Sequence, residues 1–325
     1  MQNNITEEIL IQKDNSFISA QDKLRIFYDM YMPSTLSEYI AVIQIAHGMV
    51  EHKGRYEWVG KSLSQAGFVV AINDHRGHGK SIDESHMWGE MKGNVQDKAN
   101  KADGFQKALA DMHQLTLLLK ERFVPQKFVL LGHSMGSLLA RGYLKSYQHE
   151  LDALILSGSP AYNGLVGFGQ VLAEILKFCQ LKQWGKHLIN NLSFGNFNTP
   201  FLHNKGEDNT KGGFAWLCRD KAVVEAYKAD SACQFVLSLE SFIGLFKGMK
   251  CVNDMQGLQG ENLPLLIISG SCDSCGNFGI GVEKIAYQYE QCGFNVELIL
   301  YEGARHEILN EINKEQVLED ILNFI

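Results

Sequence analysis

The residues with the clearest chemical potential are Gly132-His133-Ser134-Met135-Gly136, a G-x-S-x-G pentapeptide. An unbroken apolar run, Phe128 to Leu131, precedes it, and a stretch with helical spacing, Ser137 to Tyr147, follows it. A strand, a sharp turn through serine and a helix would present the serine hydroxyl at a helix N-terminus above a sheet. The two glycines would let strand and helix approach closely. Ser134 is therefore a candidate nucleophile, and an ordinary glycine-rich turn is the alternative.

A serine nucleophile needs a base within hydrogen-bond reach and an acid that orients the base. Eleven histidines compete for the role of base. In a strand–turn–helix site of this kind the chain order is serine, then acid, then histidine. Asp273 and His306 each follow an apolar run, so Ser134, Asp273 and His306 fit that order. A turn-forming role is the alternative for Asp273, and Asp254 is the reserve acid.

The oxyanion that forms during acyl transfer needs two fixed N–H donors. The backbone N–H of Met135, the residue after the nucleophile, is one candidate. The other lies in the loop that begins His47-Gly48, after an early apolar run. Gly48 would permit a tight turn that aims the Met49 N–H inward. A plain turn at the end of a strand is the alternative for this loop.

The composition is that of a globular protein: 325 residues, 45% hydrophobic and 21% charged. The formal net charge is −7, and no basic run is present, which argues against nucleic acid as a partner. The negative charge also removes simple electrostatic attraction to anionic membranes. No 18-residue apolar stretch is present, so we expect no transmembrane helix.

Seven scattered cysteines, an odd number, suggest reduced thiols. Because residues 1–8 lack a basic start and an apolar core, no secretory signal is expected, and we predict a cytoplasmic protein. Cys272 and Cys275 form a C-x-x-C pair without a second pair or histidines at ligand spacing. We therefore expect no metal there.

Apolar runs and helical patterns alternate along the chain, which predicts an α/β fold: a mostly parallel sheet with helices on both faces. The regular pattern breaks after Ser159-Pro160 and resumes near Leu265. We expect a core formed by residues 1–160 and 251–325, and an inserted helical cap at 161–250. The expected strands are 7–19, 24–32, 40–45, 68–72, 128–132, 153–157, 265–269 and 296–301, and the main helices are 55–66, 104–123, 137–147, 165–181, 281–292 and 314–325.

Together these motifs resemble the monoacylglycerol lipase and lysophospholipase group of α/β-hydrolases, which shares a sequence family with some serine aminopeptidases. The resemblance rests on His47-Gly48-x-x-Glu51-His52-x-Gly54-Arg55-Tyr56, Asp74-His75-Arg76-Gly77-His78-Gly79-x-Ser81, the pentapeptide at 132–136, Ser269-Gly270-x-x-Asp273 and Ala304-Arg305-His306-Glu307-Ile308-Leu309-Asn310-Glu311. It spans nearly the whole chain outside the cap. The chain departs from the group at Ser274-Cys275, where a hydrophobic residue often follows the acid.

The resemblance implies that Ser134, Asp273 and His306 form a catalytic triad and that the Met49 and Met135 amides form the oxyanion hole. It also implies that Glu51, Arg55 and His133 stand near the polar end of an acyl-glycerol pocket. Opposite charges four residues apart also allow Glu51 and Arg55 to be a salt bridge that only braces the loop.

The expected reaction is cofactor-free hydrolysis of a small lipid ester, a monoacylglycerol or lysophospholipid, through an acyl-enzyme. The alternatives are a short-chain carboxylesterase, a serine aminopeptidase in which Glu207-Asp208 would hold the free amine, and a catalytically inactive fold used for binding. The apolar stretch from Leu165 would pack on the core, line an acyl pocket or touch a membrane transiently.

Overall fold

The computed structural model describes residues 8–35, 39–93, 102–203 and 213–325. In these ranges eight strands form one sheet, in the order β1-β2-β4-β3-β5-β6-β7-β8. β1 pairs with β2 and β2 with β4 in antiparallel fashion, and all the other neighbours are parallel. The strands are β1 (Ile9–Ile18), β2 (Arg25–Pro33), β3 (Val42–Ala46), β4 (Val69–Asn73), β5 (Phe128–His133), β6 (Ala153–Ser157), β7 (Pro264–Gly270) and β8 (Asn295–Tyr301).

Continuous apolar runs form the central strands because both faces of the sheet are covered. Every residue of β3, β4, β5 and β6 is buried. β3 begins at Val42 rather than at Ile40 as expected, because Ile40 lies outside the ladder with 52% of its surface exposed. The predicted fold class, a mostly parallel sheet within an α/β fold, is confirmed.

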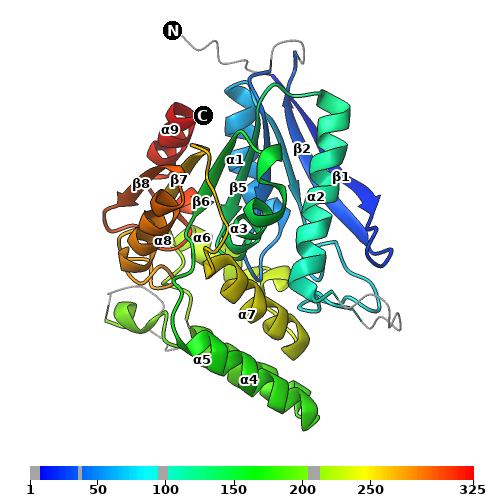
Figure 1. Ribbon diagram of the computed structural model, residues 1–325, viewed down its shortest axis with the longest axis vertical. Helices are drawn as coiled ribbons and strands as arrows, with labels where there is room; N and C mark the ends of the chain where they lie inside the picture. Colours follow the sequence, from blue (N-terminus) through cyan, green and yellow to red (C-terminus); the bar gives the residue numbers. More distant parts are fainter. Residues whose placement is uncertain (1–7, 36–38, 94–101, 204–212) are drawn as a thin grey trace.

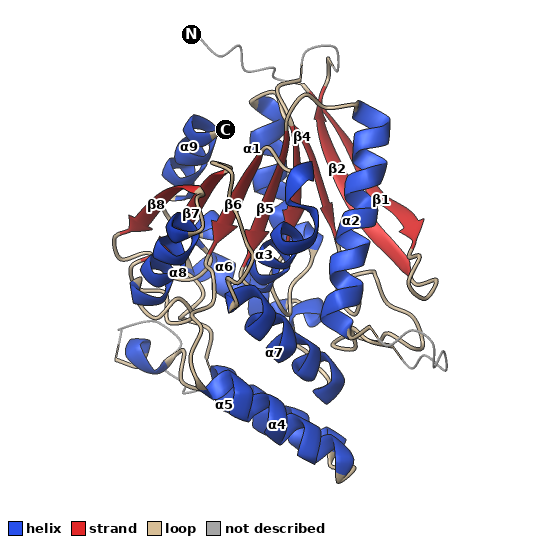
Figure 2. Cartoon of the chain, viewed as in Figure 1, coloured by secondary structure: helices blue, strands red, loops and turns tan. Residues whose placement is uncertain are grey.

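Helices pack on both faces of the sheet (Figures 1 and 2). One apolar cluster joins one face of the sheet to α2 (Gly104–Phe123), α3 (Met135–Tyr147), α7 (Leu239–Asn253) and α8 (Ile280–Gln291), and it extends to Val166, Ala173, Leu176 and Ile189 after β6. A second cluster joins the other face to α1 (Glu57–Gln65) and α9 (Lys314–Phe324). This layering leaves the carboxyl edge of the parallel strands for the loops that carry polar side chains.

The segment between β6 and β7 contains α4 (Leu165–Phe178), α5 (Lys182–Phe194), α6 (Lys221–Ala229) and α7, and none of its described residues forms a strand. In Figure 1, α4 and α5 lie side by side beyond the sheet, below the other helices. The expected cap boundary at residue 250 falls inside α7, which packs on α2 and α3 as well as on α4. No helix in the described ranges is long and apolar enough to cross a membrane.

Close approach of β5, α3 and β3 fixes the turn at Ser134. A Cβ atom on Gly132 would overlap the Gly136 carbonyl, and one on Gly136 would overlap the Ala46 carbonyl. Both neighbours are backbone atoms, which cannot move aside as a flexible side chain can. Glycine is therefore required at these two positions by close backbone contacts, and not only by the conformation of the turn.

We predict that Gly136→Ala destabilises the fold by about 1–3 kcal/mol, the usual cost of overpacking, because α3 must move away from β3. Gly167 in α4 is the matched control, since nothing lies within 4 Å of a Cβ built there. Gly167→Ala should be neutral or stabilising, by up to about 1 kcal/mol from helix propensity. Urea unfolding of both variants measures the difference. Equal free energies of unfolding for the two variants would contradict the packing account.

Candidate active site

Ser134 occupies a strained turn between β5 and α3. Its backbone has φ 53° and ψ −115°, a conformation that residues with side chains seldom adopt. Its N–H donates to the carbonyl of Ser157 at the end of β6, at 2.9 Å. Together with the tight glycine contacts, this hydrogen bond holds the turn. The Ser134 hydroxyl is thereby placed at the carboxyl edge of the sheet and at the N-terminus of α3.

Three side chains form a hydrogen-bonded chain across that edge. His306 Nε2 lies 2.9 Å from Ser134 Oγ, and His306 Nδ1 lies 3.0 Å from both carboxylate oxygens of Asp273. Asp273 follows β7, His306 follows β8, and Asp273 is fully buried. The structure thus brings together the three residues that the chain order predicted. The reserve acid, Asp254, caps the end of α7 and accepts from the Gln256 N–H instead.

Backbone hydrogen bonds hold both Asp273 and the segment that carries His306. Asp273 Oδ1 accepts from the Cys275 N–H at 2.8 Å, so the C-x-x-C pair flanks the acid and supplies it with a donor. The backbone next to His306 is hydrogen-bonded to the segment that contains Trp216 and Leu217: the Glu307 N–H donates to the Leu217 carbonyl at 2.7 Å. The Trp216 ring lies with its centroid 5.0 Å from that of His306. The segment between β6 and β7 therefore supports the histidine directly.

The local charges favour protonation of His306. Burial alone lowers the pKa of an imidazole, but the carboxylates of Asp273, Glu307 and Glu51 outweigh it and raise the pKa of His306 above 6.5. Burial likewise raises the pKa of Asp273, but His306 and the backbone donors outweigh it and lower that pKa. An imidazole beside these carboxylates accepts a proton readily from a hydroxyl at its Nε2 atom.

The loop after β3 carries the predicted second donor, and His47 fixes its orientation. The His75 N–H donates to His47 Nε2 at 2.9 Å, so the proton of this ring is on Nδ1, which donates to the Gly48 carbonyl at 2.7 Å. Across a trans peptide the N–H points opposite to the carbonyl, so the Met49 N–H faces away from His47. Gly48 lies against the nucleophile, since a Cβ there would be 3.2 Å from Ser134 Cβ.

The Met135 N–H, the other predicted donor, lies in the first turn of α3, where backbone N–H groups have no acceptor within the helix. The positive end of the helix dipole lies at the same point. Met49 and Met135 both line the cavity that surrounds Ser134. Both predicted donor residues therefore lie beside the nucleophile.

Arg55 joins the loop after β3 to the loop after β8. Its guanidinium donates twice to Glu307, at 2.7 Å each, and once to Glu51, at 2.9 Å. The Glu51 carboxylate also accepts from the Tyr56 hydroxyl at 2.9 Å and from the Gly48 N–H. Burial raises the pKa of Glu307, but Arg55 outweighs it and lowers that pKa to about 2. Arg55 is absent from the described residues that line the cavity, so this geometry favours the bracing role.

A cavity of about 1020 Å³ opens above Ser134. The third residue predicted near its polar end, His133, lines it, and burial lowers the pKa of that ring to about 3, so His133 is neutral. Glu51, Glu307 and Tyr227 also line the cavity. The remaining lining is mostly apolar and comes largely from the segment between β6 and β7: Leu165, Val166, Phe168, Ile189, Leu192, Phe194, Phe197, Phe214, Trp216, Leu217, Phe235, Val236, Leu245, Phe246 and Met249.

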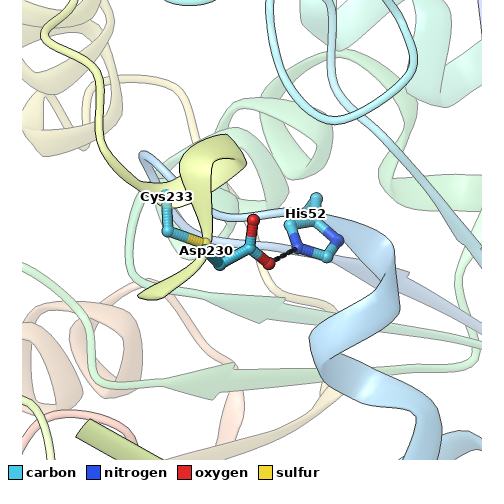
Figure 3. Close-up of side chains that lie close together, drawn as sticks. All are labelled: His52, Asp230 and Cys233. Atoms are coloured by element: carbon cyan, nitrogen blue, oxygen red, sulfur yellow. Dashed lines mark hydrogen bonds and ion pairs between the residues drawn. The ribbon is translucent and has the colours of Figure 1, made fainter. Parts of the chain in front are cut away.

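One group of described residues has the composition of a metal site: His52, Asp230 and Cys233, whose ligand atoms lie within 4.8 Å of one another (Figure 3). The Gly54 N–H donates to His52 Nδ1 at 3.1 Å, so the proton is on Nε2, which donates to Asp230 at 2.8 Å. A metal on Nε2 would force that proton onto Nδ1, against the Gly54 N–H. Burial also raises the pKa of the Cys233 thiol to about 12. This chemistry favours a structural His–Asp pair.

Sequence reasoning missed Tyr227, Trp216 and the role of Glu307. Tyr227 and Trp216 lie in the part of the chain without a regular pattern, where no signal marks them. Glu307 is adjacent to His306, and its charge could have been matched to that of Arg55 had the two loops been known to meet. Their contact joins residues 252 apart in the sequence.

Comparison with known proteins agrees with this architecture. A monoacylglycerol lipase of Mycolicibacterium smegmatis is 29% identical over 309 residues, which is 93% of each chain. A lipase solved in an open form has a TM-score of 0.80 at 27% identity, covering 97% of this chain and 98% of the other. A thermostable carboxyl esterase from Bacillus coagulans, in complex with glycerol, has a TM-score of 0.80 at 26% identity over 97% of both chains.

The family model described as serine aminopeptidase, S33 matches residues 37–313, which include β3 to β8 and the residues that carry Ser134, Asp273 and His306. The chain has the α/β-hydrolase fold and belongs to the serine aminopeptidase S33 family.

Proposed function

We propose that this chain is a serine hydrolase that cleaves carboxylic esters of single-chain lipids, a monoacylglycerol or a lysophospholipid, with Ser134, His306 and Asp273 as the catalytic triad. One observation carries the proposal: the hydrogen-bonded chain of these three side chains opens into a large, mostly apolar cavity. The lipase and esterase names of the relatives agree with it.

In this mechanism His306 removes the Ser134 proton, and the serine oxygen attacks the ester carbonyl. The oxyanion accepts hydrogen bonds from the Met49 and Met135 amides. His306 then gives its proton to the leaving alcohol. Water attacks the acyl-enzyme with His306 again as base, which frees the carboxylic acid and restores the serine. Each step uses groups of the chain and water, without a cofactor.

The lining of the cavity supports a lipid acyl chain over a small polar substrate. Pockets that bind apolar ligands are lined by aliphatic and aromatic side chains with few polar groups. A free amine, as in an aminopeptidase substrate, would need an unpaired carboxylate. Among the described lining residues only Glu51 and Glu307 are acidic, and both pair with Arg55. Glu207-Asp208, suggested for that role, lies outside the described residues.

We also propose that Glu51 and Arg55 brace residues 47–52, the loop after β3 that carries the Met49 N–H and is called the oxyanion loop below, and that His133 forms part of the pocket wall. A cytoplasmic location fits the cysteines, all seven of which are free thiols.

The outer face of α4 supports transient contact with a lipid surface. Leu165, Phe168, Val171, Ile175 and Phe178 recur at helical spacing and are each more than half exposed. Exposed apolar stripes of this kind mark interaction surfaces. Leu165 and Phe168 also line the cavity, so the stripe begins at the rim of the active site. A single-chain lipid could therefore pass from an aggregate into the cavity along α4.

Ser134→Ala should lower ester turnover by roughly a millionfold, because the triad acts as a unit. Asp273→Asn should lower it by about 10⁴, because the wrong tautomer of His306 is then favoured. Hydrolysis of monoacylglycerol and labelling by a fluorophosphonate probe measure both effects. Asp254→Asn is the matched control and should retain activity. A Ser134→Ala variant within tenfold of the parent would refute the proposed nucleophile.

The acid limb of kcat/KM should have its midpoint above pH 6.5, because His306 must be neutral to act as base and its pKa is raised. Activity is therefore lost as the pH falls through that midpoint. Glu307→Gln removes one of the charges that raise the pKa and should move the midpoint down. Glu302→Gln, an exposed carboxylate nearby in the chain, is the control and should leave it in place. Profiles on a soluble nitrophenyl ester test this, and a parent midpoint below 6.5 contradicts it.

Ile175→Ser combined with Phe178→Ser should weaken binding to phosphatidylcholine vesicles by about tenfold or more, because each large side chain contributes roughly 1.5–3 kcal/mol when fully buried. Neither residue lines the cavity, so hydrolysis of a soluble short-chain ester should be unchanged. Leu117→Ser with Val124→Ser removes exposed apolar groups near α2 as a control. Equal vesicle binding by parent and α4 variant would rule out contact through α4.

A further inference from the structure

Val50, in the loop that carries Met49, has an unfavourable backbone conformation. Its φ is 58°, in the left-handed region, and it is 8% exposed. A β-branched residue in that region is a rare outlier, because its side chain crowds the backbone. Such a conformation persists only where surrounding contacts impose it.

The left-handed turn at Val50 closes the oxyanion loop. It brings Glu51 back so that its carboxylate accepts from the Gly48 N–H, while His47 holds the Gly48 carbonyl. Gly48 is thus held at its N–H by Glu51 and at its carbonyl by His47, and the Met49 N–H, which points opposite to that carbonyl, is turned away from His47. If Val50 relaxed to a negative φ, the turn would open and Glu51 would leave Gly48.

One side chain from a distant segment holds the carbonyl of Val50. The Tyr227 hydroxyl, at the end of α6, donates to it at 3.0 Å. Tyr227 is 7% exposed, and its ring packs 4.8 Å from the Arg55 guanidinium, so the hydroxyl is held in place. The His52–Asp230 pair forms a second contact between the same two segments.

We propose that Tyr227 is a positioning residue: its hydroxyl holds Val50 in the left-handed conformation and so keeps the Met49 N–H turned toward Ser134. The oxyanion hole then exists only while α6 is docked on the loop. This inference rests on the proposed function, in which the Met49 N–H binds the oxyanion. Stabilisation of the oxyanion by Met49 then depends on the position of the segment between β6 and β7.

A double-mutant cycle tests the proposal, with a soluble nitrophenyl ester that has no head group. Tyr227→Phe keeps the ring and removes only the hydroxyl, so it should lower kcat about tenfold with little change in KM. In a Val50→Gly background the same substitution should change kcat by less than about twofold, because glycine adopts the left-handed conformation without strain. Tyr301→Phe, which removes the hydroxyl that donates to Asp320 at 2.8 Å, is the matched control and should retain activity.

An equal loss from Tyr227→Phe in both backgrounds would overturn the proposal and indicate direct contact of the hydroxyl with substrate. No loss in either background would overturn it as well. A parent chain that hydrolyses no ester and resists fluorophosphonate would instead refute the proposed function. Hydrogen exchange of a peptide spanning residues 47–52 then tests the inference without catalysis. Exchange of this peptide should be faster in Tyr227→Phe than in the parent, and unchanged in Tyr301→Phe. Unchanged exchange in Tyr227→Phe would overturn the proposed role of Tyr227.

Discussion

The pairing of Arg55 with Glu51 and Glu307 is the interaction on which the geometry of the site most depends. It ties the loop after β3 to the loop after β8, and these loops carry the Met49 N–H and His306. Both carboxylates are almost fully buried, so breaking the pair would leave uncompensated charge, which typically costs about 3–5 kcal/mol. A single guanidinium therefore fixes the distance between His306 and Met49, the proposed base and the proposed oxyanion donor.

The same cluster has an electrostatic consequence. Arg55 pairs with Glu51 and Glu307, while Asp273 pairs with His306 itself, so three carboxylates and one guanidinium leave an excess of negative charge around the imidazole. In the proposed mechanism, a positive charge on His306 is therefore stabilised where it forms, at the moment the serine loses its proton. Because these groups are already oriented by hydrogen bonds, the stabilisation needs no reorganisation during the reaction. The Arg55–Glu51–Glu307 cluster would thus stabilise the charge on His306 as well as fix the position of the two loops.

The sequence predicted most of the sheet and the three hydrogen-bonded residues, because both depend on local patterns. Most strands appear as apolar runs, and Asp273 and His306 lie in the loops after β7 and β8. The helix expected at 104–123 from its apolar spacing matches α2 to the residue; in the structure Asp103 caps its start and Val124 ends it in a left-handed conformation. What could not be predicted depends on contacts between distant segments: the second partner of Arg55, the support of His306 by Trp216 and Leu217, and the hydrogen bond between Tyr227 and Val50. No periodicity marks such pairs.

Two strained residues, Ser134 and Val50, show how differently the site secures its backbone. Ser134 is fixed by the closest contacts of β5, α3 and β3, which belong to the core and do not depend on the inserted segment. Val50 is fixed by side chains, and one of them comes from α6. The inserted segment thus forms the walls of the cavity, supports His306 and holds the oxyanion loop, while its outer face on α4 stays exposed. Changes that alter the cavity wall at residues such as Phe168 or Phe194 can adjust the substrate without touching these supports. Changes near Trp216 or Tyr227 alter the supports themselves. Under the proposed function, Trp216 and Tyr227 therefore have two roles, because they line the cavity and also contact the loops that carry His306 and Met49.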